Sequence, residues 1–176
     1  MIFRLPDAAG KLEKVKMLLL DVDGVMTDGK IIYADSGSEI KAFYVKDGLG
    51  MRLLMNAGIK IGVITGRSSE ALRHRCKNLN IEYIFDGVSD KAVILDKIVE
   101  ITGIKASEIA YMGDDLPDIP VMRNTGIPIA VADAHEKVIE TASIVTEAKG
   151  GNGAIREVCE AILKAQKQWE SALKRF

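Results

Sequence analysis

The residues that could do chemistry begin with two aspartates, Asp21 and Asp23, which directly follow the apolar run 17–20. Alternate side chains of a strand point to the same side, so both carboxylates can face one small volume. Two carboxylates this close repel each other unless a cation or a shared proton compensates them. The pair therefore indicates a cation site in which one oxygen stays free to attack an electrophile. The alternative is a strand that ends in a solvated acidic turn.

A second acidic cluster, Asp114, Asp115 and Asp118, follows the apolar run 109–112. Asp114 comes directly after Gly113, where the backbone can turn sharply. Carboxylate oxygens are the ligands that Mg²⁺ prefers, so this cluster and the first pair predict a magnesium site. Asp118 either orients a metal-bound water or caps the following helix, and the sequence leaves both roles open.

Two further segments offer groups that bind phosphate. The apolar run 59–65 ends in Thr65 and Gly66, ahead of a helical pattern whose free N–H groups accept an anion. This signal is weak alone, because a serine such as Ser68 commonly caps a helix. Lys91 falls near the start of the next helical pattern, where a cation opposes the helix dipole. An anion within its reach would explain that placement; the alternative is a solvated lysine.

Together these groups predict phosphoryl transfer. Asp21 would attack phosphorus to form an aspartyl-phosphate, with Mg²⁺ neutralising the developing charge. Asp23 would protonate the leaving oxygen and later activate water.

Short apolar runs at 17–20, 59–65, 83–85, 109–112 and 128–131 alternate with helical patterns at 48–57, 68–79, 90–102, 116–124 and 134–141. This alternation predicts an α/β fold with a doubly wound, mostly parallel sheet, whose ligands bind beyond the carboxyl ends of the strands. Residues 30–45 interrupt the alternation with two β-rich runs, which predict a projecting hairpin. An amphipathic tail helix is expected over about 153–175.

Composition restricts the class of protein. With 176 residues, 48% hydrophobic and 28% charged, we expect a single domain, 1–176, with one sizeable core. A net charge of −1 gives no basic field, and no apolar run approaches a membrane span of about 20 residues, so we expect neither a nucleic-acid nor a membrane partner. The start lacks the pattern of a signal peptide, and Cys76 and Cys159 are expected to be reduced thiols in helices, which favours the cytoplasm.

From about residue 15 onward, this motif series resembles the haloacid dehalogenase (HAD) superfamily of phosphatases. The resemblance implies a HAD-like Rossmannoid fold with Asp21 as nucleophile, Asp23 as acid/base, and Thr65 and Lys91 as further catalytic residues. It also implies that Mg²⁺ is held by Asp21, Asp114 and the backbone carbonyl of Asp23. The segments 24–64 and 92–113 are filled by the hairpin and the predicted helices and strands, so no cap domain fits and we expect an open, capless site.

The segments 42–52, 64–67, 73–76 and 150–159 resemble 3-deoxy-D-manno-octulosonate 8-phosphate phosphatases. This resemblance implies a homotetramer that dephosphorylates a small sugar acid phosphate in lipopolysaccharide precursor synthesis, with neighbouring subunits shaping the pocket. The substrate contacts that it implies are Asp23, Tyr44, Val45, Lys46, Asp47, Gly48, Arg52, Gly66, Arg67, Arg75 and Lys91. Several arginines suit a substrate that carries both a carboxylate and a phosphate, although a surface ion pair is the alternative for each.

Two other functions stay open. A related family dephosphorylates nine-carbon nonulosonate 9-phosphates; its members tend to carry an acidic residue after Thr-Gly, whereas Arg67 resembles the octulosonate enzymes. A catalytically silent regulatory subunit with the same fold is the other, and the intact motif residues argue against it. His74 and His135 are expected to be surface or hydrogen-bonded residues and not metal ligands.

Overall fold

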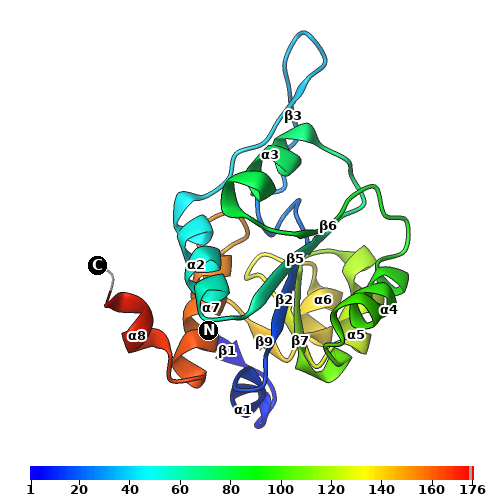
Figure 1. Ribbon diagram of the computed structural model, residues 1–176. Helices are drawn as coiled ribbons and strands as arrows, with labels where there is room; N and C mark the ends of the chain where they lie inside the picture. The colour runs from blue at the N-terminus through cyan, green and yellow to red at the C-terminus, as the bar shows by residue number, and fades with distance from the viewer. Residues whose placement is uncertain (175) are drawn as a thin grey trace.

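The computed structural model describes residues 1–174 and 176, and its centre is a seven-stranded sheet in the order β1-β9-β8-β7-β2-β5-β6 (Figure 1). β1 runs antiparallel to β9, and every other neighbouring pair in this sheet is parallel. Its strands are β1 (Ile2–Phe3), β2 (Met17–Leu20), β5 (Lys60–Ile64), β6 (Tyr83–Phe85), β7 (Ile109–Gly113), β8 (Ile127–Ala130) and β9 (Ile144–Val145). The predicted doubly wound, mostly parallel α/β fold is confirmed.

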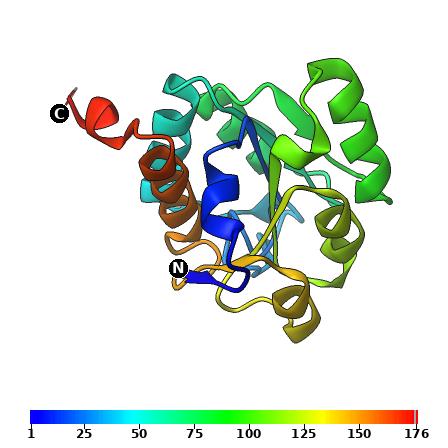
Figure 2. The same ribbon diagram turned by 90° about the horizontal axis from the view of Figure 1, so that it is seen from below.

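Helices cover both faces of the sheet (Figure 2). They are α1 (Ala8–Leu12), α2 (Val45–Asn56), α3 (Glu70–Leu79), α4 (Lys91–Thr102), α5 (Ile119–Asn124), α6 (Glu136–Thr141), α7 (Ala154–Ala165) and α8 (Trp169–Leu173), with short 3-10 turns at Ala106–Glu108 and Leu116–Asp118. One core forms between the sheet and α1, α2, α3 and α7, and the other between the sheet and α4, α5 and α6.

The central strand β2 shows why its sequence is apolar throughout. Leu18 and Leu20 point into the first core, whereas Met17 and Leu19 point into the second. All four side chains are buried, because successive residues of a strand face opposite sides and both sides are covered. A continuous apolar run is therefore the signature of this strand.

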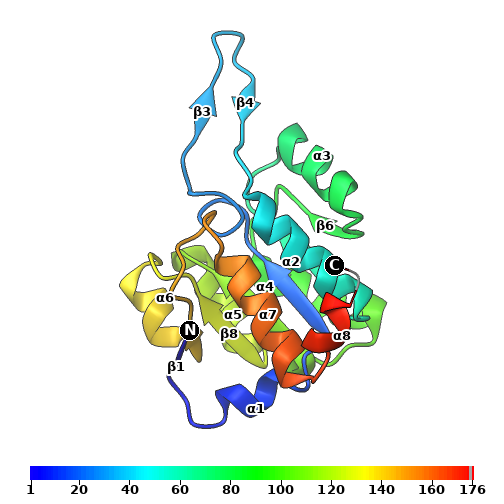
Figure 3. The same ribbon diagram turned by 90° about the vertical axis from the view of Figure 1, so that its left-hand side faces the viewer.

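The predicted hairpin is present. β3 (Ile32–Tyr33) and β4 (Glu39–Ile40) pair antiparallel as a separate two-stranded sheet. Figure 3 shows this hairpin extending away from the body of the molecule, beyond the end of α2. Between β2 and β5 the described chain forms only this hairpin and α2, so no cap domain is inserted there.

The prediction of a single tail helix over about 153–175 is wrong. The structure has two helices, α7 and α8, and Lys167 between them adopts a left-handed backbone with φ of 57°. The N–H of Gln168 donates to the carbonyl of Leu163 (2.8 Å), which closes the end of α7. Residue 175 lies outside the described part of the chain. The edge strands β1 and β9 and helix α1 were not predicted, because segments this short carry too few residues for a periodic pattern.

Among the residues that the structure describes, no helix has the length and apolarity that a membrane crossing requires.

Candidate active site

The parallel register brings the predicted chemical groups to one edge of the sheet. Leu20 of β2 pairs with Val63 of β5 on one side and with Met112 of β7 on the other. The carboxyl ends of these strands therefore lie together, and Asp21, Thr65 and Asp114 follow them. A pocket of about 780 Å³ opens at this edge, and its lining includes Asp21, Asp23, Thr65, Gly66, Arg67, Lys91, Asp114, Asp115 and Asp118.

Lys91 is the cation at the centre of this pocket. It is the first residue of α4, and its Nζ donates to Asp21 Oδ1 (2.7 Å) and to Asp118 Oδ1 (2.6 Å). Its side chain is only 9% exposed, so the cost of burying an ammonium group is offset by the two carboxylates. Burial lowers the pKa of Lys91, but Asp21 and Asp118 outweigh it and the net shift is upward. The unfavourable position at a helix N-terminus thus has a direct explanation.

Asp118 holds several of these groups in place through hydrogen bonds. Its Oδ1 accepts hydrogen bonds from Lys91 Nζ and from the hydroxyl of Tyr111 (2.6 Å), and its Oδ2 accepts from the backbone N–H groups of Asp114 (2.8 Å) and Asp115 (3.2 Å). A carboxylate has about four lone-pair positions, and all four are used here. Asp118 is therefore an anchor for Lys91 and for the turn after β7. Its side chain makes no capping hydrogen bond to α5, and its orientation of a metal-bound water stays a prediction.

The carboxylates of Asp21 and Asp114 are the pair that fits a divalent cation. Ligand oxygens of Asp21, Asp114 and Asp118 all lie within 4.8 Å of one another. Asp114 Oδ1 is buried without a hydrogen-bond partner, which is costly for a carboxylate unless a cation is bound. Because Asp118 is saturated by protein donors, Asp21 and Asp114 are the side chains left for an ion. An all-oxygen donor set of this kind suits Mg²⁺.

Gly24 makes the close approach of these groups possible. Its φ is 94°, and a Cβ at this position would lie 2.1 Å from Asp114 Oδ2, so a side chain would displace the carboxylate. Gly150 packs on the other side, where a Cβ would lie 1.6 Å from the carbonyl oxygen of Gly24. Gly151 N–H also donates to Val25 O (2.9 Å). The loop 150–153 therefore supports the turn that follows Asp21.

The electrostatics of the pocket follow from its burial. Burial, and then repulsion from Asp118, raises the pKa of Asp21 to about 6, although Lys91 acts in the opposite direction. Burial, and then repulsion from Asp21, raises the pKa of Asp114 to about 8. Both shifts arise because three carboxylates share one partly dry space with a single ammonium group. A divalent cation would reverse this balance.

Asp23 is surrounded by groups from the hairpin and from the loop after β5. Lys41 Nζ donates a hydrogen bond to Asp23 Oδ1, and Arg67 Nε lies 3.7 Å from Asp23 Oδ2. Both cations also contact Glu39. Lys41 and Glu39 were not predicted as site residues, because no local motif marks them and only the folding back of the hairpin brings them to Asp23.

Several residues expected to touch the substrate fix the start of α2 within this chain. Asp47 is buried and accepts from the backbone N–H groups of Arg156 (2.8 Å) and Gly153 (3.4 Å), which joins α2 to α7. Arg75 donates from Nη2 to the carbonyl of Tyr44 (3.2 Å). A Cβ at Gly48 would lie 2.4 Å from that same Nη2, so Gly48 makes room for the guanidinium. None of these residues lines the pocket at the strand ends.

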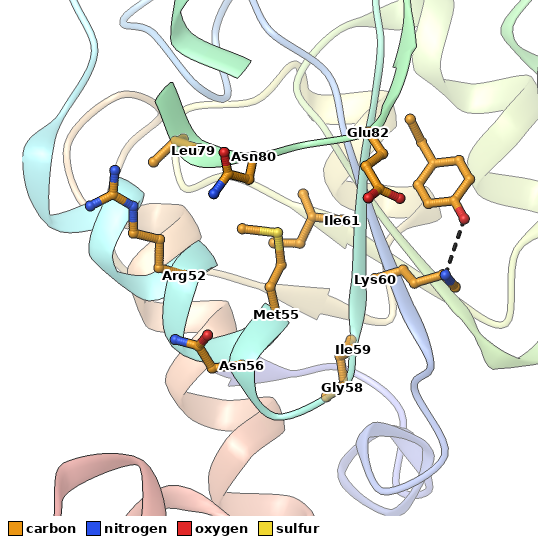
Figure 4. A pocket seen from close by; sticks show the side chains of 11 residues that line it. Arg52, Met55, Asn56, Gly58, Ile59, Lys60, Ile61, Leu79, Asn80 and Glu82 are labelled. Atoms are coloured by element: carbon orange, nitrogen blue, oxygen red, sulfur yellow. Dashed lines mark hydrogen bonds between the residues drawn. The ribbon is translucent and has the colours of Figure 1, made fainter. Parts of the chain in front are cut away.

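Val45, Lys46 and Arg52 are also outside this pocket in the single chain. Val45 is 78% exposed and Lys46 is exposed. Arg52 lines another pocket, of about 430 Å³, beside the amino-terminal ends of β5 and β6 (Figure 4). There its Nη2 donates to the carbonyl of Asn78 (2.7 Å). Their contacts with substrate stay a prediction, because the single chain does not bring these side chains to the pocket at the strand ends.

The two histidines have other positions. His135 is the N-cap of α6. Its ring Nδ1 accepts a hydrogen bond from the backbone N–H of Lys137 (3.1 Å), and its backbone N–H donates to the carbonyl of Asp114 (2.8 Å). His74 is exposed on α3. Neither is in the pocket.

The raised pKa values predict how stability changes with pH. Without metal, the folded protein holds protons on Asp21 and Asp114 more tightly than the unfolded chain does, so its stability falls as pH rises from about 4 to about 8. Mg²⁺ binds the ionised pair, so it should raise Tm by about 5 °C or more near pH 8 at saturation, and by less near pH 5, where protons compete. Thermal denaturation with and without MgCl₂ measures this. Asp114→Asn should remove most of the difference; an equal Mg²⁺ effect at both pH values would contradict the assignment.

Comparisons with known proteins agree with this geometry. A family model described as haloacid dehalogenase-like hydrolase matches residues 83–158. The 3-deoxy-D-manno-octulosonate 8-phosphate phosphatase KdsC of Salmonella typhimurium is 42% identical over 167 residues, which are 95% of this chain and 89% of the relative. That of Yersinia pestis is 43% identical over 166 residues, 94% of this chain and 89% of the relative.

Solved structures of related proteins have the same fold as this chain. The same phosphatase from Moraxella catarrhalis, in complex with magnesium, phosphate and KDO, has a TM-score of 0.95 at 42% identity and covers 98% of this chain and 99% of its own. The cobalt-bound enzyme from Haemophilus influenzae has a TM-score of 0.89 at 40% identity, covering 93% and 95%. The chain belongs to the 3-deoxy-D-manno-octulosonate 8-phosphate phosphatase family of haloacid dehalogenase-like hydrolases.

Proposed function

We propose that this chain is a Mg²⁺-dependent phosphatase that hydrolyses 3-deoxy-D-manno-octulosonate 8-phosphate to KDO and phosphate. The observation that carries the proposal is the convergence of Asp21, Asp114 and Lys91 at one sheet edge, in a chain whose relatives are phosphatases of this substrate. The relative crystallised with magnesium, phosphate and KDO supports both the metal and the product. The functional domain comprises the whole chain, 1–176.

In the proposed reaction, an oxygen of Asp21 attacks the phosphorus atom. The new bond joins Asp21 to phosphorus, and the bond from phosphorus to the sugar oxygen breaks. Asp23 gives a proton to that leaving oxygen, so the sugar departs as an alcohol. Asp23 then takes a proton from water, which attacks the aspartyl-phosphate and releases phosphate. Lys91 neutralises charge beside Asp21, and the hydroxyl of Thr65 lines the same pocket.

The metal would be held by Asp21 and Asp114, together with the backbone carbonyl of Asp23. When bound, Mg²⁺ supplies positive charge that lowers repulsion between the phosphoryl oxygens and the attacking carboxylate. Lys91 Nζ donates a hydrogen bond to Asp21 Oδ1, so one oxygen of this carboxylate is already held by a cation of the protein.

The sugar part of the substrate carries a carboxylate, which arginine recognises well through paired hydrogen bonds. Arg67 is the arginine among the described lining residues of the pocket and its side chain is 42% exposed, so it is the arginine best placed for that contact. The exposed residues among the remaining expected contacts, Val45, Lys46 and Arg52, would reach the substrate of a neighbouring subunit. Tyr44, Asp47, Gly48 and Arg75 would act by fixing the start of α2 that carries these side chains.

A homotetramer would supply those contacts and cover exposed apolar surface. The hairpin and the start of α2 expose a run of large apolar side chains, and such patches usually mark interaction surfaces. They are Ile31 (47%), Ile32 (46%), Tyr33 (63%), Ile40 (51%), Val45 (78%) and Leu49 (38%). We place the enzyme in the cytoplasm, in the synthesis of lipopolysaccharide precursors. Cys76 and Cys159, both free and buried, are compatible with a reducing compartment.

Replacing the nucleophile tests the reaction itself. Asp21→Asn keeps the shape of the side chain but removes the attacking carboxylate, so phosphate release should fall by about 10³-fold or more. Phosphate release from the sugar acid phosphate and from p-nitrophenyl phosphate, with and without a chelator, measures this. Asp96→Asn, on the exposed face of α4, is the matched control and should keep full activity. A silent regulatory subunit would show no activity before the substitution.

The size of the sugar acid tests the substrate assignment. The parent enzyme should have a higher kcat/KM for the eight-carbon 8-phosphate than for a nine-carbon nonulosonate 9-phosphate. Arg67→Glu should reduce the ratio of these two values by about 10-fold or more, because the nine-carbon phosphatases tend to carry an acidic residue at this position after Thr-Gly. Steady-state kinetics on both substrates give the ratio. A parent that prefers the nine-carbon substrate would establish the alternative function.

The hairpin surface tests the assembly. Tyr33→Asp together with Ile40→Asp places two charges in the exposed apolar surface, so the tetramer should dissociate. Size-exclusion chromatography with light scattering measures the mass. Lys30→Asp, on the polar stretch before β3, is the control and should leave the mass unchanged. A parent protein that is monomeric at micromolar concentration would rule out the tetramer.

A further inference from the structure

Lys41 is a buried cation in a segment that otherwise projects into solvent. It follows β4 directly, and its side chain is only 2% exposed. Its ammonium group donates to Asp23 and lies 3.0 Å from Glu39 Oε1. Burial of a lysine ammonium is costly unless carboxylates compensate it, and both of these do. The base of the hairpin, at Lys41, therefore holds a buried positive charge in contact with Asp23, the proposed acid/base.

Arg67 closes this contact into a ring. Its Nη2 lies 2.5 Å from Glu39 Oε2, and its Nε lies 3.7 Å from Asp23 Oδ2. The charges of Asp23, Lys41, Glu39 and Arg67 alternate in sign around the ring. Arg67 is 42% exposed, whereas Lys41 is enclosed. Arg67 is thus the member that can turn toward a substrate, and Lys41 is the member that stays in place.

Glu39 holds both cations of the ring. The hydrogen bond from Arg67 and the ion pair with Lys41 lower the pKa of Glu39 to about 2, so its carboxylate stays ionised near neutral pH. Its negative charge balances Lys41, which can then donate a hydrogen bond to Asp23 without an unpaired positive charge in the pocket.

A carboxylate that transfers a proton needs a fixed orientation. The last torsion of an aspartate side chain is soft, with a broad distribution, so an unsupported carboxylate turns freely. Proton transfer requires the acid to lie within about 3 Å of the oxygen that receives the proton. Lys41 engages Oδ1 of Asp23, whereas Oδ2 has only the more distant Arg67 Nε. Oδ2 is therefore the oxygen free for the leaving group.

We infer that Lys41 is a positioning residue that orients the Asp23 carboxylate for proton transfer to the leaving oxygen, and that Glu39 keeps Lys41 in place. The inference rests on the proposed function, because it requires Asp23 to be the acid/base. It assigns the base of the hairpin a role in the chemical step within one chain, independent of any contact that the hairpin makes with a neighbour.

Leaving groups of different acidity separate this role from a purely structural one. p-Nitrophenolate departs without a proton, whereas phenolate and sugar alkoxides need one, and kcat/KM reports the step in which the leaving group departs. Lys41→Met should lower kcat/KM for phenyl phosphate by about 30-fold or more, but for p-nitrophenyl phosphate by only about 3-fold. Lys41→Arg keeps a donor and should restore most of the activity. Lys30→Met, at an exposed lysine of the same hairpin, should change neither value.

A double-mutant cycle completes the test. In an Asp23→Asn background, Lys41→Met should cause no further loss, because the residue through which it acts is gone. Glu39→Gln should also lower kcat/KM for phenyl phosphate more than kcat/KM for p-nitrophenyl phosphate. If circular dichroism shows that Lys41→Met does not fold, Glu39→Gln takes its place in the comparison. Equal losses on both aryl phosphates, or no loss on either, would overturn the inference. Aryl phosphates alone decide it, so a failure of the parent on the sugar acid phosphate counts against the proposed function and not against Lys41.

Discussion

The structure of the site depends on one buried cation, Lys91, shared between two carboxylates. Its contacts with Asp21 and Asp118 join three segments that are far apart in the sequence: the end of β2, the start of α4 and the turn after β7. Without this ammonium group, three carboxylates would face one another in a partly dry pocket, and the elements that carry them would repel. Lys91 thus balances the charge of the metal-free pocket and holds the Asp21 carboxylate in place with the same atom.

The side chains around Asp21 and Asp114 have little freedom to move. Four hydrogen bonds fix Asp118, and Gly24 leaves just enough room for Asp114. The remaining freedom lies in the oxygens that point into the pocket, where a cation and a phosphoryl group would meet. Rigid anchors behind the site and unpaired oxygens within it are what a preorganised phosphoryl-transfer site requires.

Much of this arrangement could be predicted from the sequence. The alternation of apolar runs with helical patterns predicted the parallel sheet, and the position of Asp21, Thr65 and Asp114 after such runs predicted their meeting at one edge. Lys91 was identified because a lysine at a helix start needs an anion. The contacts of Lys41 and Glu39 could not be predicted, because they depend on how the hairpin folds back and not on a local pattern. The break at Lys167 was missed for a similar reason: a non-glycine residue rarely adopts a left-handed backbone, so nothing in its type marks the end of α7.

The packing of Gly150 against Gly24 has a consequence for how this protein can vary. No side chain of the loop 150–153 takes part in the proposed chemistry, yet a methyl group at 150 would overlap the carbonyl oxygen of Gly24, in the turn that follows Asp21. Substitution of Gly150 is therefore limited by the closeness of its backbone to the Gly24 carbonyl, and not by any chemical role of residue 150. In a saturation mutagenesis screen for lost turnover, position 150 should be as sensitive as the aspartates of the proposed mechanism, although no atom of Gly150 would contact the phosphate ester.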